Sequence, residues 1–244
     1  MMKVVERILA GILMASLLLV LIISSVEIAV YSDYGYFEKE FKKYDVNNES
    51  GIVNMEMDEL IGVTKEMMSY LRGDREDLVI YATIDGETKE FFNDREKSHM
   101  ADVRDVFVAA LDVRAGASLM AVISFINLFL LMYWRDIKKL LFRAYLCAIG
   151  VLGVIVCTLF VWACIDFTGL FYKFHALFFS NYEWILDPDI SRLVNIVPEG
   201  FFVDTAIRIV VIFILLIIIM GALLLFAKNI NEKSRKIQLG GTYE

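Results

Sequence analysis

Four long runs of uncharged, mostly apolar residues limit what this chain can fold into. They cover residues 8–26, 115–134, 144–165 and 209–227. A helix needs about 20 such residues to cross the ~30 Å hydrocarbon core of a membrane, and the runs are 19 to 22 residues long. Hydrophobic residues make up 58% of the chain, more than soluble domains usually contain. We therefore predict a mainly α membrane protein built on a bundle of four transmembrane helices.

The charged residues between the runs predict the orientation of the chain. Segments 1–7, 135–143 and 228–244 together hold ten Lys and Arg residues against four Asp and Glu. Because short segments rich in Lys and Arg stay in the cytoplasm, we predict that these three, with both termini, are cytoplasmic. Segments 27–114 and 166–208 are then extracytoplasmic and hold most of the acidic residues. The formal net charge of −7 comes from them and gives no reason to expect a nucleic acid as partner.

The longer outer segment, 27–114, has the pattern of a small α+β portion. Apolar residues recur with helical spacing in 54–71, which predicts an amphipathic helix. Two strand-like stretches, 78–83 and 88–92, flank Asp85-Gly86, a pair typical of the type I′ turn of a β-hairpin. A two-stranded hairpin is only marginally stable alone, so we expect it to pack against helices.

The shorter outer segment, 166–208, carries an unusual load of ten aromatic residues. Tyr and Trp are enriched where a membrane meets water, because each ring has an apolar body and a polar end. We therefore predict an aromatic interfacial loop. At its end, Asp204 and Arg208 are four residues apart, a spacing that favours a local ion pair.

His99 is one of only two histidines and lies in a predicted helix that continues into the second run. Helical spacing places Arg95, His99 and Asp102 on one face, where the carboxylate could fix the imidazole tautomer and stabilise the imidazolium. The alternative is a solvated helix face that includes a histidine. His99 precedes the run by sixteen residues, about 24 Å of straight helix, so we expect a break around 115–117 to return it to the interface.

His175 lies among four phenylalanines at helical spacings, which desolvates the imidazole and favours its neutral form. The alternative is a buried histidine whose ring is satisfied by one backbone carbonyl. Four further residues of the loop could support or position a substrate. In particular, Asn181 could donate to an oxyanion, Asp187 could hold His175 or cap the helix after Pro188, and Glu199 could orient either histidine. The four are Asn181, Trp184, Asp187 and Glu199.

Several common catalytic patterns are missing from the sequence. It contains no G-x-S-x-G nucleophile motif, no H-E-x-x-H zinc motif and no phosphate-binding glycine loop. The three cysteines all lie in the run 144–165, which predicts neither a disulfide nor a thiolate metal site. We therefore predict no cofactor and no metal.

Three motifs together carry a resemblance to a known family. They are FFNDREKSHMADV (91–103), FHALFFSNYEWILDP (174–188) and PEGFFVD (198–204). In this order they resemble the bacterial lipoprotein intramolecular transacylases, four-span proteins of the bacterial plasma membrane, and the resemblance extends over nearly the whole chain. It implies that the protein moves the sn-2 acyl chain of a diacylglyceryl-cysteine to the cysteine α-amino group and so makes a lyso-form lipoprotein.

The resemblance also implies which residues act and on what. His99 and His175 would be the catalytic histidines, working as an acid–base pair on the extracytoplasmic side at the interface between membrane and water. The expected partners are diacylglyceryl-modified lipoproteins and membrane lipid, and a monomer is expected. Two other classes stay open from the residues alone. One is a non-enzymatic membrane protein whose outer domain binds or senses a partner; the other is a zinc-dependent membrane hydrolase.

Overall fold

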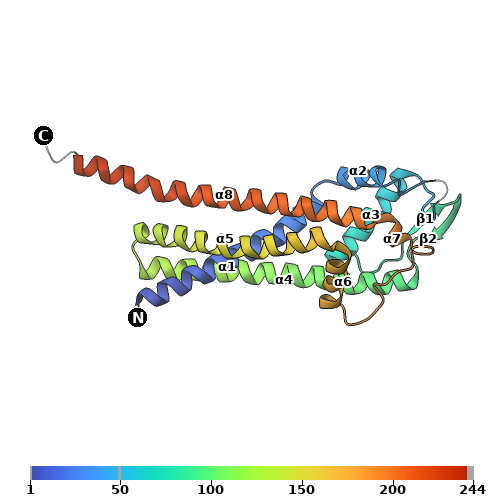
Figure 1. The fold of residues 1–244 in the computed structure, drawn as a ribbon, viewed down its shortest axis with the longest axis horizontal. Helices are drawn as coiled ribbons and strands as arrows, with labels where there is room; N and C mark the ends of the chain where they lie inside the picture. The colour runs from blue at the N-terminus through green and yellow to red at the C-terminus, as the bar shows by residue number, and fades with distance from the viewer. Residues whose placement is uncertain (1, 49–50, 241–244) are drawn as a thin grey trace. The chain divides into compact units, whose positions relative to one another are not determined.

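The structure is a computed structural model that describes residues 2–48 and 51–240 (Figure 1). Met1 and the last four residues of the predicted tail 228–244 lie outside the described residues. The described chain forms eight helices and two strands. These are α1 (Met2–Tyr31), α2 (Gly35–Lys43), α3 (Met57–Arg72), β1 (Tyr81–Ile84), β2 (Glu87–Glu90), α4 (Asp94–Leu131), α5 (Trp134–Ile165), α6 (Phe167–Phe178), α7 (Arg192–Ile196) and α8 (Glu199–Gly240).

The chain divides into two compact units, which we call the span unit and the mixed unit. The span unit consists of Met1–Ser25, Val113–Phe167 and Val211–Glu244. The mixed unit consists of Val26–Asp112 and Thr168–Val210. Both candidate catalytic histidines, His99 and His175, therefore belong to the mixed unit.

Four helices are long and apolar enough to cross a membrane, as the four uncharged runs predicted. They are α1, α4, α5 and α8. In the span unit Leu13, Leu128 and Ile137 lie in a buried cluster between helices. Other apolar side chains of these helices are largely exposed: Leu130 at 76%, Val154 at 68% and Phe226 at 67%. Apolar surface of this extent is the surface that lipid covers in a membrane protein. The fold class is thus the predicted one.

Helix α4 runs without interruption from Asp94 to Leu131, so the predicted break around 115–117 was wrong. One glycine costs a helix only about 1 kcal/mol relative to alanine, and a break would leave backbone N–H and C=O groups without partners. A Cβ added at Gly116 would meet no atom within 4 Å, so packing does not force a break there either. His99 therefore lies about 24 Å from Ala115 along the continuous helix α4, at 1.5 Å per residue.

The mixed unit contains the predicted amphipathic helix and hairpin. Helix α3 buries Leu60, Met67 and Leu71 along one stripe and ends at Gly73, whose φ of +88° is the left-handed conformation typical of a helix C-terminus. Strand β1 packs against α3 and pairs antiparallel with β2 in the register Ile84↔Glu87. The two strands are joined by Asp85-Gly86, both with positive φ (+54° and +75°), as a type I′ turn requires.

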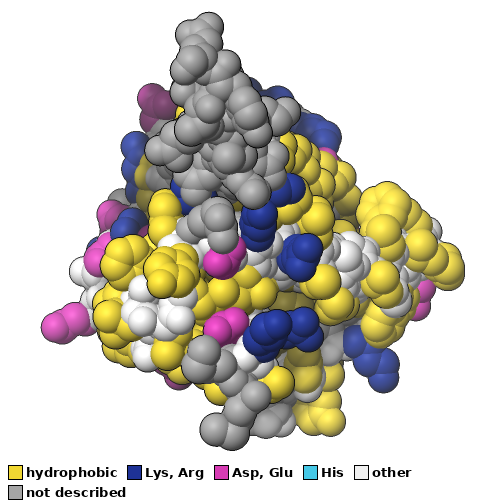
Figure 2. Space-filling view, turned by 90° about the vertical axis from the view of Figure 1, so that its left-hand side faces the viewer, with side chains coloured by type: hydrophobic (Ala, Val, Ile, Leu, Met, Phe, Trp, Pro, Cys, Tyr) yellow, Lys and Arg dark blue, Asp and Glu magenta, His cyan; other side chains and the backbone are white. Residues whose placement is uncertain are grey.

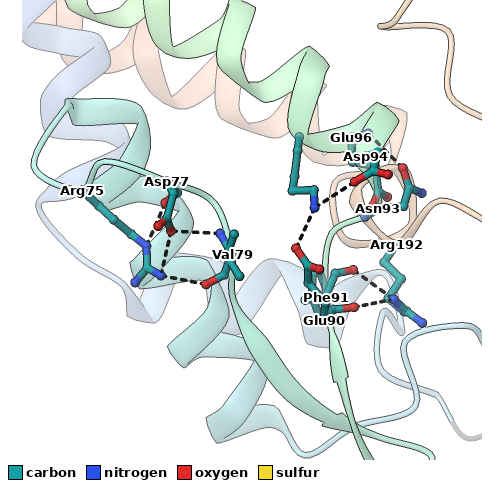
Figure 3. A network of polar contacts seen from close by, with 10 residues as sticks. Arg75, Asp77, Val79, Glu90, Phe91, Asn93, Asp94, Glu96 and Arg192 are labelled. Carbon is teal, nitrogen blue, oxygen red and sulfur yellow. Dashed lines mark hydrogen bonds and ion pairs between the residues drawn. The ribbon is translucent and has the colours of Figure 1, made fainter.

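A buried carboxylate fixes the start of α4 (Figure 3). Glu96 and Asn93 form a reciprocal cap: the Glu96 N–H donates to the Asn93 side chain at 3.0 Å, and the Asn93 N–H donates to Glu96 Oε2 at 2.7 Å. The other carboxylate oxygen accepts from Ser191 Oγ at 2.6 Å and from the Leu193 N–H at 2.7 Å. This Glu96 clamp joins the first turn of α4 to the start of α7. His99 follows Glu96 by three residues, so the clamp also positions His99.

A second polar cluster joins α2 to the start of α8 and corrects one prediction. Asp204 does not pair with Arg208. It instead accepts hydrogen bonds from the Lys43 ammonium and from the Tyr44 hydroxyl, the latter at 2.6 Å. The Arg208 guanidinium lies over the Tyr36 ring, 4.0 Å from its centroid. Asp204 and Arg208 are one turn apart on α8, as the spacing predicted, but each contacts residues in or directly after α2 and not the other.

Candidate active site

The two histidines meet in the mixed unit although 75 residues separate them in the sequence. His99 projects from α4 and His175 from α6, and their ring centroids are 6.1 Å apart with an angle of 36° between the planes. Each residue is 8% exposed. The histidines are therefore together, as an acid–base pair requires.

Aromatic rings surround the pair. Trp184 is stacked on His175 at 4.9 Å, and Phe171 lies 4.1 Å from the same ring. Phe179 contacts both histidines and meets His99 edge-on at 5.3 Å. These rings remove water from the imidazoles, so the site has a low local polarity.

One hydrogen bond determines the tautomer of His175. Its Nδ1 lies 2.8 Å from the carbonyl oxygen of Phe171, one helical turn earlier in α6. A carbonyl oxygen can only accept, so Nδ1–H is the donor and the neutral ring keeps its lone pair on Nε2. The alternative in which His175 is a buried histidine predicted a bond of its ring to one backbone carbonyl, and this bond is present. The same bond prepares Nε2 to accept a proton.

His99 has no such fixed tautomer. Its Nδ1 is buried and has no hydrogen-bond partner among the described residues. The Asp102 carboxylate, which was expected to accept from this imidazole, instead accepts from Asn181 Nδ2 at 2.7 Å. A buried nitrogen without a partner costs about 1–3 kcal/mol and is typical of a site that binds something else.

Burial keeps both histidines neutral. The pKa of His99 is lowered to about 4, mainly by desolvation and in addition by the nearby His175, while the Asp102 carboxylate opposes the shift. Desolvation also lowers the pKa of His175, while its bond to the Phe171 carbonyl opposes that shift. Both residues lie outside the four uncharged runs. At neutral pH the pair therefore consists of two neutral imidazoles.

Asn181 and Trp184 connect the two histidine-bearing helices. Besides its bond to Asp102 on α4, Asn181 accepts the indole N–H of Trp184 on its backbone carbonyl at 3.0 Å. Trp184 in turn is stacked on His175. The two residues therefore support the histidine pair. One of the two Nδ2 hydrogens of Asn181 is used in the bond to Asp102, so one is left that could donate to an oxyanion.

Arg95 holds the same loop from outside the pair. Its Nη2 donates to the carbonyl of Tyr182 at 2.9 Å, and its Nε lies 3.6 Å from the Glu183 carboxylate. The side chain is half exposed. Arg95 thus shares a helix face with His99, as predicted, and contacts the segment that carries Asn181 and Trp184.

Asp187 and Glu199 hold neither histidine, and Asp187 does not cap the helix after Pro188, so the three roles suggested for these residues were wrong. The Asp187 carboxylate accepts from the Asp189 N–H at 3.0 Å, and the short helix after Pro188 is capped by Ser191. Glu199 accepts from the Thr168 hydroxyl at 3.2 Å. Asp187 thus stabilises its own turn, and Glu199 joins the start of α8 to the start of α6.

Sequence reasoning missed the Glu96 clamp, although the signal was present. Asn93 followed three residues later by Glu96 is a capping pattern at the start of a helix. What the pattern could not give is the second half of the clamp, which comes from residues about 95 positions later. In the part of the chain that the structure describes, no group of three or more His, Cys, Asp and Glu side chains could hold a metal ion.

Comparisons with known proteins agree on one family. The sequence profile described as "Lipoprotein intramolecular transacylase Lit" matches residues 11–202. The solved structure of the membrane integral lipoprotein intramolecular transacylase Lit from Bacillus cereus matches with a TM-score of 0.72 at 19% identity, covering 95% of this chain and 98% of that one. No curated protein matches the chain.

Two further structures are variants of the Bacillus cereus protein in which a histidine is replaced. The alanine variant matches with a TM-score of 0.72 at 20% identity, covering 95% of this chain and 96% of that one. The arginine variant matches with a TM-score of 0.73 at 19% identity, covering 94% of each. At this identity the structures show that the fold is the same.

Proposed function

Because this chain belongs to the lipoprotein intramolecular transacylase family, we propose that His99 and His175 are the acid–base pair of its acyl transfer. The family makes the protein a membrane acyltransferase. The observation that carries the proposal is the 6.1 Å approach of two buried histidines from separate segments of the mixed unit. Arg95, Asp102, Asn181 and Trp184 are positioning residues in this proposal, since they hold the histidines and the loop between them.

The substrate is a lipoprotein with a diacylglyceryl group on its N-terminal cysteine. The cysteine α-amine attacks the sn-2 ester of the same molecule through an eight-membered ring that contains the amine nitrogen, Cα, Cβ, sulfur, two glycerol carbons, the ester oxygen and the acyl carbon. A C–N bond forms, the bond from the acyl carbon to the glycerol oxygen breaks, and that oxygen leaves as a hydroxyl. Since both reacting groups belong to one molecule, no enzyme nucleophile is required, and the pocket acts by orienting them.

The two histidines have different environments, and these assign different roles. His175 Nε2 carries the lone pair and takes the proton from the attacking amine. That proton then passes to His99, whose imidazolium has a pKa of about 4 and so readily gives it to the departing glycerol oxygen. Both rings start and end neutral, because the proton taken from the amine is the one delivered to the oxygen. The reaction consumes no net proton.

The experiment for this proposal uses a reporter lipoprotein in a host without its own N-acylating enzyme. The two forms are isomers of equal mass, so tandem mass spectrometry of the N-terminal lipopeptide is used to locate the acyl chain. It should find the lyso-form when this chain is expressed and only the diacylglyceryl form when it is not. A well-expressed protein that leaves the diacylglyceryl form unchanged would instead favour the non-enzymatic partner-binding class. Loss of one acyl chain from the lipopeptide without N-acylation, abolished by chelation and restored by zinc, would favour the hydrolase class.

The pH dependence should follow the lowered pKa values of the pair. A histidine whose pKa lies below its ordinary 6.5 stays neutral above that pH, and it becomes protonated and loses its basic lone pair only as the pH falls further. After division by the neutral fraction of the substrate amine (pKa about 7.7–8.0), the single-turnover rate should be nearly flat around pH 8 and fall to half its maximum only below pH 6.5. A corrected profile with a midpoint at or above 6.5 would contradict two desolvated histidines.

The proposed site lies on the extracytoplasmic side, with both termini in the cytoplasm. The support is the excess of Lys and Arg in 1–7, 135–143 and 228–244. Alkaline phosphatase fused within 166–208 should be active, because that enzyme folds only outside the cytoplasm, whereas a fusion within 135–143 should be inactive. The opposite pattern would place the histidine pair in the cytoplasm and exclude the proposed orientation.

A further inference from the structure

A cavity of about 810 Å³ lies within the span unit, between α1 and α5, and the proposed acyl transfer does not use it. Small residues make room for it: Gly11 and Ala15 on α1 lie opposite Ala144 and Ala148 on α5. A Cβ added at Gly11 would meet no atom within 4 Å. The cavity is thus an open groove between two apolar helices and is not filled by neighbouring side chains.

The groove is long and has one cationic end. Along α1 it extends from Arg7 to Ile22, which is about 22 Å at 1.5 Å per residue. Its remaining lining on both helices is apolar, apart from Arg143 on α5. One leaflet of a bilayer is about 15 Å of hydrocarbon, so the groove is long enough for a complete lipid chain.

The two arginines are available to bind an anion. Arg7 and Arg143 are both exposed, and neither forms a hydrogen bond or an ion pair with another described residue. The chain's charge distribution places both near the cytoplasmic ends of their spans. Figure 2, which views the end of the molecule where α1 begins, shows Lys and Arg side chains gathered among hydrophobic ones. A guanidinium is planar and binds a phosphate through two parallel hydrogen bonds.

We propose that this groove binds one anionic phospholipid of the cytoplasmic leaflet. The phosphate lies on Arg7 and Arg143, and an acyl chain follows the apolar lining toward Ile22. Basic pockets between transmembrane helices on the cytoplasmic side bind anionic headgroups in this way. The diacylglyceryl group of a lipoprotein carries no anion and would leave both arginines unpaired. The inference is independent of the proposed acyl transfer, because it concerns other residues and has a binding readout.

The test is lipid retention by the purified full-length protein. The protein in mild detergent is mixed with equal amounts of phosphatidylglycerol and phosphatidylcholine of the same chains, re-isolated, and its bound lipid is measured by mass spectrometry. The wild type should retain about one phosphatidylglycerol per chain, with an anionic preference of about 30-fold from two arginines. The double variant Arg7→Gln/Arg143→Gln should lose this preference. The matched control Lys3→Gln/Lys139→Gln removes two positive charges outside the groove lining and should keep it.

A second variant separates the groove from the charges. Ala15→Phe fills the groove and leaves both arginines in place, so it should reduce retention of both lipids while the protein still elutes as one species on size exclusion. Equal retention of the two lipids by the wild type would overturn the proposal. So would one-for-one displacement of phosphatidylglycerol by a synthetic diacylglyceryl lipopeptide, since the groove would then belong to the substrate.

Discussion

Replacing His175 with alanine is expected to lower the rate of acyl transfer by about 10²–10⁴-fold, the usual contribution of a general base. The reason is that the Nδ1–H of His175 donates to the Phe171 carbonyl, which leaves the lone pair of Nε2 free to accept a proton. His99→Ala should have an effect of the same order, because it removes the proton donor of the pair. The measurement is the ratio of lyso-form to diacylglyceryl lipopeptide over time, at equal amounts of enzyme.

Two variants distinguish a catalytic from a structural role for these histidines. His175→Asn keeps an N–H near the position of Nδ1, so it can still donate to the Phe171 carbonyl but has no basic nitrogen; it should be as inactive as His175→Ala while unfolding at a higher temperature. Asp105→Ala changes an exposed residue of the same helix as His99 and should keep wild-type activity. An active His175→Asn enzyme would show that His175 is structural.

The double variant tests whether the histidines act as one unit. If the proton passes between them, His99→Ala/His175→Ala should cost little more than the larger single effect, because either loss already stops the relay. If they assist separate steps, the two losses should multiply. Full multiplication of the effects would leave two catalytic histidines but would exclude the shared proton.

What the sequence predicted well depends on short-range physics. The four spans follow from uncharged runs of sufficient length, and the hairpin follows from Asp85-Gly86, whose positive φ angles only a few residue pairs adopt easily. The neutral state of His175 follows from its phenylalanine neighbours one turn away in α6. In each of these cases the information lies within a few residues of the feature it determines.

What the sequence could not give depends on contacts between distant segments. Asp204 and Arg208 were expected to pair because they are one turn apart, but Lys43 at the end of α2 and Tyr44 directly after it reach Asp204. Asp102 was expected to bind His99 for the same reason, and Asn181 takes its carboxylate from 79 residues away. For His99 and His175 the sequence indicated two histidines in outer segments on one membrane face, and the family resemblance implied that they act as a pair, but no spacing rule relates α4 to α6.

The second large effect concerns the stability of the site and not its chemistry. Glu96 is 1% exposed, and its carboxylate accepts from the Asn93 N–H, the Leu193 N–H and the Ser191 hydroxyl. Glu96→Ala leaves the Ser191 hydroxyl and the Leu193 N–H, both in buried residues, without an acceptor, each at a cost of about 1–3 kcal/mol. The Asn93 N–H loses its acceptor as well, at a smaller cost because Asn93 is exposed. We expect the free energy of unfolding to decrease by about 3 kcal/mol or more, which lowers the midpoint of thermal unfolding by about 10 °C in a protein of this size.

The size of this effect is set by burial, and a matched carboxylate shows why. Glu66 is likewise a carboxylate with a close partner, in its case Arg75 at 2.6 Å, but its side chain is half exposed. Water replaces that partner when it is lost, so Glu66→Ala should cost no more than about 1 kcal/mol. Glu96→Gln keeps one acceptor oxygen and should fall between the two. Because His99 lies one turn after Glu96 on α4, activity should decline in the same order, with Glu66→Ala near wild type; a Glu96→Ala protein as stable as Glu66→Ala would show that the clamp does not hold the site.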